Sequence, residues 1–167
     1  MNTKILNEFT DTTDELLQLL SSLTEEQLNV TPSEGGWTAG QLGDHLYRSY
    51  SVIEILNGNV ESTDRKPDQK LLEIEKLFLD FSIQMESPKE ILPSNESIGK
   101  EGLLGRLQER IELQKDIIRS KDLSKVCLDF EIPEYGPFTR LEWIGFNTVH
   151  TQRHVHQLKK IIQNLSN

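Results

Sequence analysis

The stretch His150–His156 reads HTQRHVH and lies in a long C-terminal segment that is predicted to form one helix. His150 and His154 are four positions apart. On an α-helix that spacing corresponds to about 40° of rotation and roughly 6 Å of rise. The two imidazoles therefore project from one face, one turn apart, as two ligands of a single metal ion must. His156 lies about 200° around the helix from His154, so we expect it to contact a loop or solvent.

Histidine is scarce in this chain, so its clustering indicates a role. The chain has four histidines, and the fourth, His45, lies far from the other three in the sequence. It falls on the apolar stripe of a predicted helix over residues 38–56, where a core histidine bonded to a carbonyl is the ordinary interpretation. If His45 meets His150 and His154, three imidazoles would hold an ion and leave positions open for substrate, as catalytic sites do. Imidazole ligands suit zinc, nickel, copper or iron.

The length and the residue pattern predict one all-α domain over residues 1–167. A chain of 167 residues can bury a substantial core as a single domain. β-Branched and aromatic residues alternate too rarely to build many strands. The polar segment 57–69 and the segment around Pro133 and Gly136 are expected to be long loops. The pattern therefore predicts a four-helix bundle with a crossover connection and long loops. The long helices are expected at 3–22, 38–56, 98–120 and 139–165, with a short extra turn at 22–28 and an accessory helix at 71–85.

Charge and composition narrow the possible partners. The formal net charge is −9, which opposes binding to nucleic acid or to an anionic membrane. No segment reaches the ~18 apolar residues of a transmembrane helix, and the N-terminus lacks the apolar core of a signal peptide. The single cysteine, Cys127, cannot form an internal disulfide and is expected to be a small buried residue. We expect a cytoplasmic protein.

Three further residues near the histidines allow more than one role. Gln157 lies seven positions after His150 on the same face, and could hydrogen-bond a ligand or a water on the ion. Arg153 could hold an anionic substrate, although an exposed salt bridge is the simpler expectation. Glu142 is expected to be the acid of a capping box that begins at Thr139. No Ser-His-Asp order, phosphate-binding loop or glycine fingerprint appears, so nucleophilic catalysis is not predicted.

Two motifs resemble those of the DinB/YfiT-like superfamily of metal-binding four-helix bundles. The first resembles its second-helix motif and consists of Gly36-Trp37-Thr38 and Gly43-Asp44-His45-Leu46. The second resembles the last-helix motif of the DinB_2-type members and consists of Phe138–Trp143, His150–His154 and Gln157-Leu158. The resemblance covers nearly the whole chain in order and spacing. In that family the corresponding histidines bind a divalent metal, which implies His45, His150 and His154 as ligands.

The resemblance also implies an activity. Relatives in this family include metal-dependent transferases that conjugate low-molecular-weight thiols such as bacillithiol, mycothiol-dependent isomerases, and proteins described as hydrolases. It therefore implies a thiol S-transferase or related hydrolase that acts on a small molecule. Zinc or nickel would hold the thiol cofactor as a thiolate. Homodimers are common in the family, so a homodimer is expected.

Two other interpretations remain open from the sequence. The chain could be a non-catalytic metal-binding or dimer-forming module, in which the ion stabilises the fold and no substrate pocket opens onto it. The histidines could also be ordinary polar core residues that bind nothing. The sequence does not identify the substrate or the physiological metal, and it assigns no functional role to His156 or Cys127.

Overall fold

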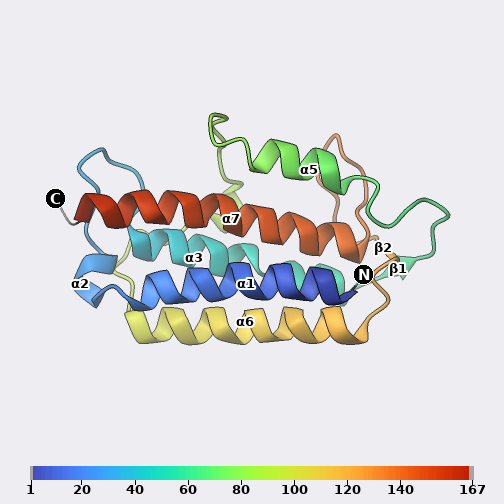
Figure 1. Cartoon of the computed structure of the whole chain (residues 1–167), viewed down its shortest axis with the longest axis horizontal. Helices are drawn as coiled ribbons and strands as arrows, with labels where there is room; N and C mark the ends of the chain where they lie inside the picture. Colours follow the sequence, from blue (N-terminus) through green and yellow to red (C-terminus); the bar gives the residue numbers. More distant parts are fainter. Residues whose placement is uncertain (1, 166–167) are drawn as a thin grey trace.

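The computed structural model describes residues 2–165 and is built on four long helices (Figure 1). The elements in chain order are α1 (Asn2–Ser21), α2 (Glu25–Leu28), α3 (Ala39–Ser49), α4 (Val52–Leu56), β1 (Val60–Glu61), α5 (Leu71–Phe78), the 3₁₀ helix η1 (Lys89–Ile91), α6 (Lys100–Ser120), β2 (Val126–Cys127) and α7 (Arg140–Leu165). Within the described residues, no helix is both long enough and apolar enough to cross a membrane.

The four long helices form a bundle with a crossover. Helix α1 contacts α6 and α7, and α3 contacts the same two helices. Helices α3 and α6 are parallel neighbours, because both run from the end of the bundle that carries α2 toward the end that carries the strands (Figure 1). A short turn cannot join parallel neighbours, so the chain between α4 and α6 must return along the bundle. The predicted four-helix bundle with a crossover connection and long loops is confirmed.

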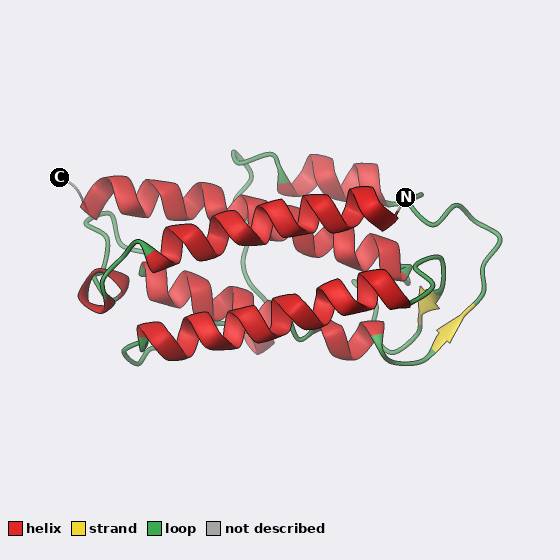
Figure 2. Ribbon diagram, turned by 60° about the horizontal axis from the view of Figure 1, so that its bottom comes forward, coloured by secondary structure: helices red, strands yellow, loops and turns green. Residues whose placement is uncertain are grey.

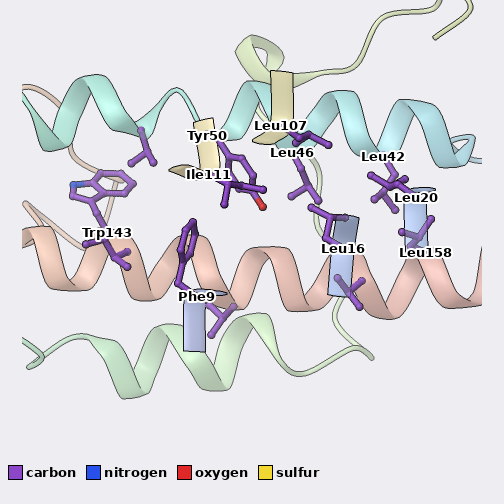
Figure 3. Packing of buried hydrophobic residues seen from close by; sticks show 14 of the residues in the cluster. Phe9, Leu16, Leu20, Leu42, Leu46, Tyr50, Leu107, Ile111, Trp143 and Leu158 are labelled. Atoms are coloured by element: carbon purple, nitrogen blue, oxygen red, sulfur yellow. The ribbon is translucent and has the colours of Figure 1, made fainter. Parts of the chain in front are cut away.

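Side chains from all four long helices fill the bundle interior (Figure 3). Apolar residues recur every three or four positions along each helix, so one face of each helix is buried against its neighbours. Eight of the ten residues labelled in Figure 3 have no exposed surface: Phe9, Leu16, Leu20, Leu42, Leu46, Tyr50, Leu107 and Leu158.

Capping boxes fix the first residue of the two helices that carry the histidines. At α3, the Thr38 hydroxyl accepts a hydrogen bond from the Gln41 amide N–H at 3.0 Å, and Gln41 Oε1 accepts from the Thr38 N–H at 3.0 Å. At α7, Thr139 and Glu142 make the same reciprocal pair at 3.1 and 2.9 Å. The predicted capping role of Glu142 is confirmed. These boxes fix the residue at which each helix begins, and they therefore also fix the face of the helix on which each histidine lies.

Glu142 also anchors the crossover connection to α7. Its carboxylate has no exposed surface and accepts two hydrogen bonds from the Arg65 guanidinium, at 2.7 and 2.8 Å. The backbone N–H of Lys70 donates a third, at 2.9 Å. The segment before α5 is therefore held on the first turn of α7, which places α5 along that helix.

Two predicted helices are shorter than the sequence pattern indicated. The helix expected over 38–56 is divided into α3 and α4, where the Ser49 hydroxyl donates to the His45 carbonyl at 2.9 Å; such bonds bend helices. The helix expected over 71–85 ends at Phe78. There the prediction was wrong because the carbonyls of Phe78 and Asp80 accept hydrogen bonds from Arg153 instead of continuing the helix.

The two long connections meet in a small sheet at one end of the bundle (Figure 2). Strands β1 and β2 are antiparallel, and Val60 pairs with Cys127. Cys127 has no exposed surface, which confirms the expected buried position. Burial raises the pKa of its thiol to about 11, so the thiol is protonated at neutral pH.

Candidate metal centre

Three histidines from two helices converge inside the bundle. His45 lies on α3, and His150 and His154 lie one turn apart on α7. The Nε2 atom of His150 is 3.2 Å from Nε2 of His45 and 3.1 Å from Nε2 of His154. The exposed fractions of His45, His150 and His154 are 0%, 8% and 8%. The structure thus brings together the three residues singled out from the sequence.

The separations between these nitrogens suit a metal ion. Two nitrogens at zinc-like bond lengths of about 2.0–2.1 Å and a tetrahedral angle lie roughly 3.3 Å apart. The observed nitrogen separations of 3.1 and 3.2 Å are close to that value. Potential ligand atoms of all three residues lie within 4.8 Å of one another.

In the rings of His45 and His154, the hydrogen bond made by Nδ1 determines that Nε2 faces the centre. His45 Nδ1 donates to the Ile91 carbonyl oxygen at 2.7 Å, and His154 Nδ1 donates to Oε1 of Gln157 at 3.0 Å. Both rings therefore carry their proton on Nδ1 and direct an Nε2 lone pair inward. The buried Nδ1 atom of His150 has no hydrogen-bond partner among the described residues. The three Nε2 atoms therefore converge with at most one proton among them, and their lone pairs suit a bound cation.

The surroundings keep all three imidazoles neutral. Burial lowers the pKa of His45, although its bond to the Ile91 carbonyl acts in the opposite direction. Burial, followed by the repulsion of the neighbouring histidines, lowers the pKa of His150 well below its usual value. Burial, followed by repulsion from His45, lowers the pKa of His154 to about 3, although its bond to Gln157 acts in the opposite direction. Neutral imidazoles are the form that binds a metal, so no proton competes at neutral pH.

Aromatic rings form the walls of the centre. The ring centroid of Trp37, which precedes α3, lies 4.7 Å from that of His45 and 6.0 Å from that of His154. Phe78 of α5 and Phe146 of α7 lie 5.9 and 5.8 Å from His150. These rings exclude water, which strengthens electrostatic interactions inside.

Sequence reasoning missed most of these surrounding groups. Phe146 precedes His150 by one helical turn, so helical spacing could have identified it. Phe78 and the Ile91 carbonyl reach the centre only through the path of the crossover connection. Trp37 was part of a recognised motif, but nothing in the sequence showed what it would touch.

Two other residues of the C-terminal stretch hold a loop over the centre. Arg153 donates to the carbonyls of Phe78 and Asp80 at 3.3 and 3.0 Å and to that of Ile83. These contacts correct the expectation of an exposed salt bridge. His156 stacks on Phe81 with ring centroids 4.0 Å apart, which confirms the expected loop contact. Arg153 and His156 thus fix the segment that follows α5.

A surface cleft lies beside the centre, between the loop before α3 and the C-terminal half of α7. Two of its lining residues, Trp37 and Gln157, contact the histidines directly, whereas no histidine lines the cleft. The other lining residues are Pro32, Glu34, Gly35, Gly36, Lys160, Ile161 and Asn164. The three histidines are therefore separated from solvent at this side by an indole ring and an amide.

Comparisons with known proteins give a family and a fold. The model of the DinB superfamily matches residues 8–158. The uncharacterized protein YuaE of Bacillus subtilis (strain 168) is 24% identical over 147 residues, which cover 85% of this chain and 87% of YuaE. The solved structure of Bacillus subtilis YfiT has a TM-score of 0.61 and 18% identity, with 99% of this chain and 87% of YfiT covered. YfiT is described as a probable metal-dependent hydrolase with an unusual four-helix bundle topology.

Proposed function

The chain belongs to the DinB superfamily, and on this basis we propose that it is a metal-dependent enzyme that acts on a small molecule. The observation that carries the proposal is the convergence of three neutral imidazoles, with nitrogen separations of 3.1 and 3.2 Å. The description of YfiT as a probable metal-dependent hydrolase supports the same class of reaction.

His45, His150 and His154 would hold the ion, for which zinc and nickel are the preferred candidates. When bound, such an ion supplies Lewis acidity and lowers the pKa of a thiol or water that it binds. The Ile91 carbonyl and Gln157 keep the rings of His45 and His154 in the orientation and tautomer that ligation needs. The aromatic walls keep bulk water from the reacting groups.

Within this class, we propose a thiol S-transferase first and a related hydrolase second. Both use a site with open coordination positions, and three protein ligands leave such positions. The thiol would be a low-molecular-weight cofactor that pairs with an electrophilic substrate. We also propose a homodimer, which light scattering of the purified protein tests directly.

One observation favours a different function, a non-catalytic metal-binding or dimer-forming module. The three histidines are nearly or fully buried, and none lines the adjacent cleft. A purely stabilising ion needs no route for a substrate. In that case metal would raise the stability of the fold and no reaction would accompany it.

The deciding experiment compares the metal-loaded protein with His150→Ala protein. Each is incubated with bacterial thiols and a model electrophile, and separately with ester and amide substrates for hydrolysis. The proposal expects turnover that requires both the metal and His150. If neither reaction is faster than with the His150→Ala protein, while metal still stabilises the fold, the non-catalytic module is the correct function.

A further inference from the structure

The candidate metal centre is closed, so a substrate needs a route into it. His45 has no exposed surface, and His150 and His154 are each 8% exposed. A small molecule can reach these nitrogens only if one wall of the centre moves. The walls differ in how firmly the rest of the structure holds them.

The wall toward η1 is tied down by several hydrogen bonds. The Ile91 carbonyl accepts from His45 at 2.7 Å. The Ser94 N–H donates to Asp44 at 2.9 Å, and the Ser94 carbonyl accepts from the Gln41 side chain at 3.1 Å. Opening the centre at this wall would break the hydrogen bonds between Ser94 and α3. It would also break the bond between the Ile91 carbonyl and His45, a candidate metal ligand.

The wall at His150 belongs to regular helices and to a held loop. Phe146 lies within α7, and Phe78 is the last residue of α5. The carbonyl of Phe78 and two carbonyls after it accept hydrogen bonds from Arg153. Movement of either ring would disturb a helix or release these bonds.

The wall formed by Trp37 is held by packing against the hydrophobic core and not by hydrogen bonds. Among the described residues, no hydrogen bond restrains its indole, which is only half-buried. The two preceding residues, Gly35 and Gly36, have φ values of +80° and +87°, which residues other than glycine rarely adopt. A Cβ at either position would meet nothing within 4 Å, so the backbone conformation, not packing, accounts for glycine here. Trp37 therefore follows two glycines whose surroundings leave the backbone room to move.

The Trp37 wall is also the one that separates the histidines from the cleft. The indole lines the cleft on one side and lies 4.7 and 6.0 Å from the rings of His45 and His154 on the other. The charged lining residues Glu34 and Lys160 have opposite signs, so the cleft has no net formal charge. Selection there would depend on shape and on contact with the indole.

We propose that this cleft is the entrance to the three-histidine centre and that Trp37 is its gate. The glycine pair lets the indole turn away from His45 and His154, while the Thr38 capping box keeps α3 in place. When the indole turns away it loses its contacts with the two histidine rings, and a substrate with a flat or apolar part would make similar contacts in its place. The role in catalysis rests on the proposed function, but access to the histidines does not.

Access is measured on metal-free protein with diethyl pyrocarbonate, a small reagent that acylates neutral imidazole. Mass spectrometry follows the rate at each histidine, and His156, which lies outside the centre, is the internal control. Trp37→Ala should raise the rates at His45, His150 and His154 by about tenfold or more, because access scales with the open population. The rate at His156 should stay unchanged.

Two further variants keep the result interpretable if Trp37→Ala loosens the fold. Asn164→Trp adds a ring at an exposed position in the cleft and should slow modification of the three central histidines severalfold. Arg153→Met releases the loop after α5 and should leave the rates at the three central histidines close to those of the unaltered protein. His156 stacks on Phe81 of this loop, so His156 is not used as the control in this variant. The proposal is overturned if Asn164→Trp has no effect, or if Arg153→Met opens the centre and Trp37→Ala does not.

Metal content, measured separately, distinguishes the two proposals. A protein that binds no metal but shows these rate changes has an entrance without the proposed function. A protein that binds metal and turns over substrate, but shows none of the rate changes, has the function and admits its substrate elsewhere.

Discussion

The Nε2 atoms of His45 and His150 lie 3.2 Å apart, although 105 positions separate the two residues in the chain. Two helices that pack side by side, α3 and α7, bring them together. The hydrogen bonds on the outer ring nitrogens then decide which atoms face the centre.

Replacing a central histidine should abolish tight metal binding. His150→Ala removes one of three ligands, so the dissociation constant for zinc should rise by more than the roughly 10–100-fold that loss of a supporting contact produces. Isothermal titration calorimetry measures it. His156→Ala, on the same helix but outside the centre, is the matched control. Equal affinity in the two variants would show that His150 is not a ligand.

Gln157→Leu should weaken metal binding without removing a ligand. Gln157 Oε1 accepts from His154 Nδ1 at 3.0 Å, and its loss leaves the ring free to turn. We expect a loss of affinity of about 10–100-fold. Gln152→Leu is a suitable control, because Gln152 bonds Thr12 at 3.3 Å and no histidine. If both variants bind zinc equally well, the supporting role of Gln157 is wrong.

The metal-free protein should lose stability as the pH falls below about 6.5. The folded-state pKa is lowered at His45 and His150, and lowered to about 3 at His154. As the pH falls, these histidines therefore bind protons in the unfolded chain before they do so in the folded chain. Their contribution to the free energy of unfolding is present above the unfolded pKa and is lost below it. Urea unfolding between pH 7 and pH 5, with a chelator present, measures the slope.

A histidine variant separates this effect from the titration of carboxylates. His150→Phe removes one titrating group and places an apolar ring between Phe78 and Phe146. The slope of unfolding free energy against pH should fall by up to about 1.4 kcal/mol per pH unit, the value for one proton. An unchanged slope would mean that His150 takes up its proton in the folded state as well.

Removing the buried carboxylate at the start of α7 should be strongly destabilising. Glu142→Ala leaves Arg65 without its partner and also removes the capping acid. Loss of one partner of a buried pair costs about 3–5 kcal/mol. The exposed pair of Arg119 and Asp116 is the comparison, and Asp116→Ala should cost less than about 1 kcal/mol. Similar unfolding free energies for the two variants would contradict the anchoring role.

The sequence by itself determined the features that depend on neighbours a few residues away. Capping boxes at Thr38 and Thr139 predicted where α3 and α7 begin, because each box is closed by residues three positions apart. The face shared by His150 and His154 followed from helical geometry. The four long helices followed from apolar residues at helical spacing.

Only the tertiary structure decided what depends on the path of the long connections. The end of α5 at Phe78 was unpredictable because Arg153, far along the chain, binds the carbonyls that would have continued the helix. The same holds for the Ile91 carbonyl on His45 and for Trp37 between the cleft and the histidines. Spacing along one helix fixes neighbours within that helix, whereas contacts between distant segments depend on how the whole core packs.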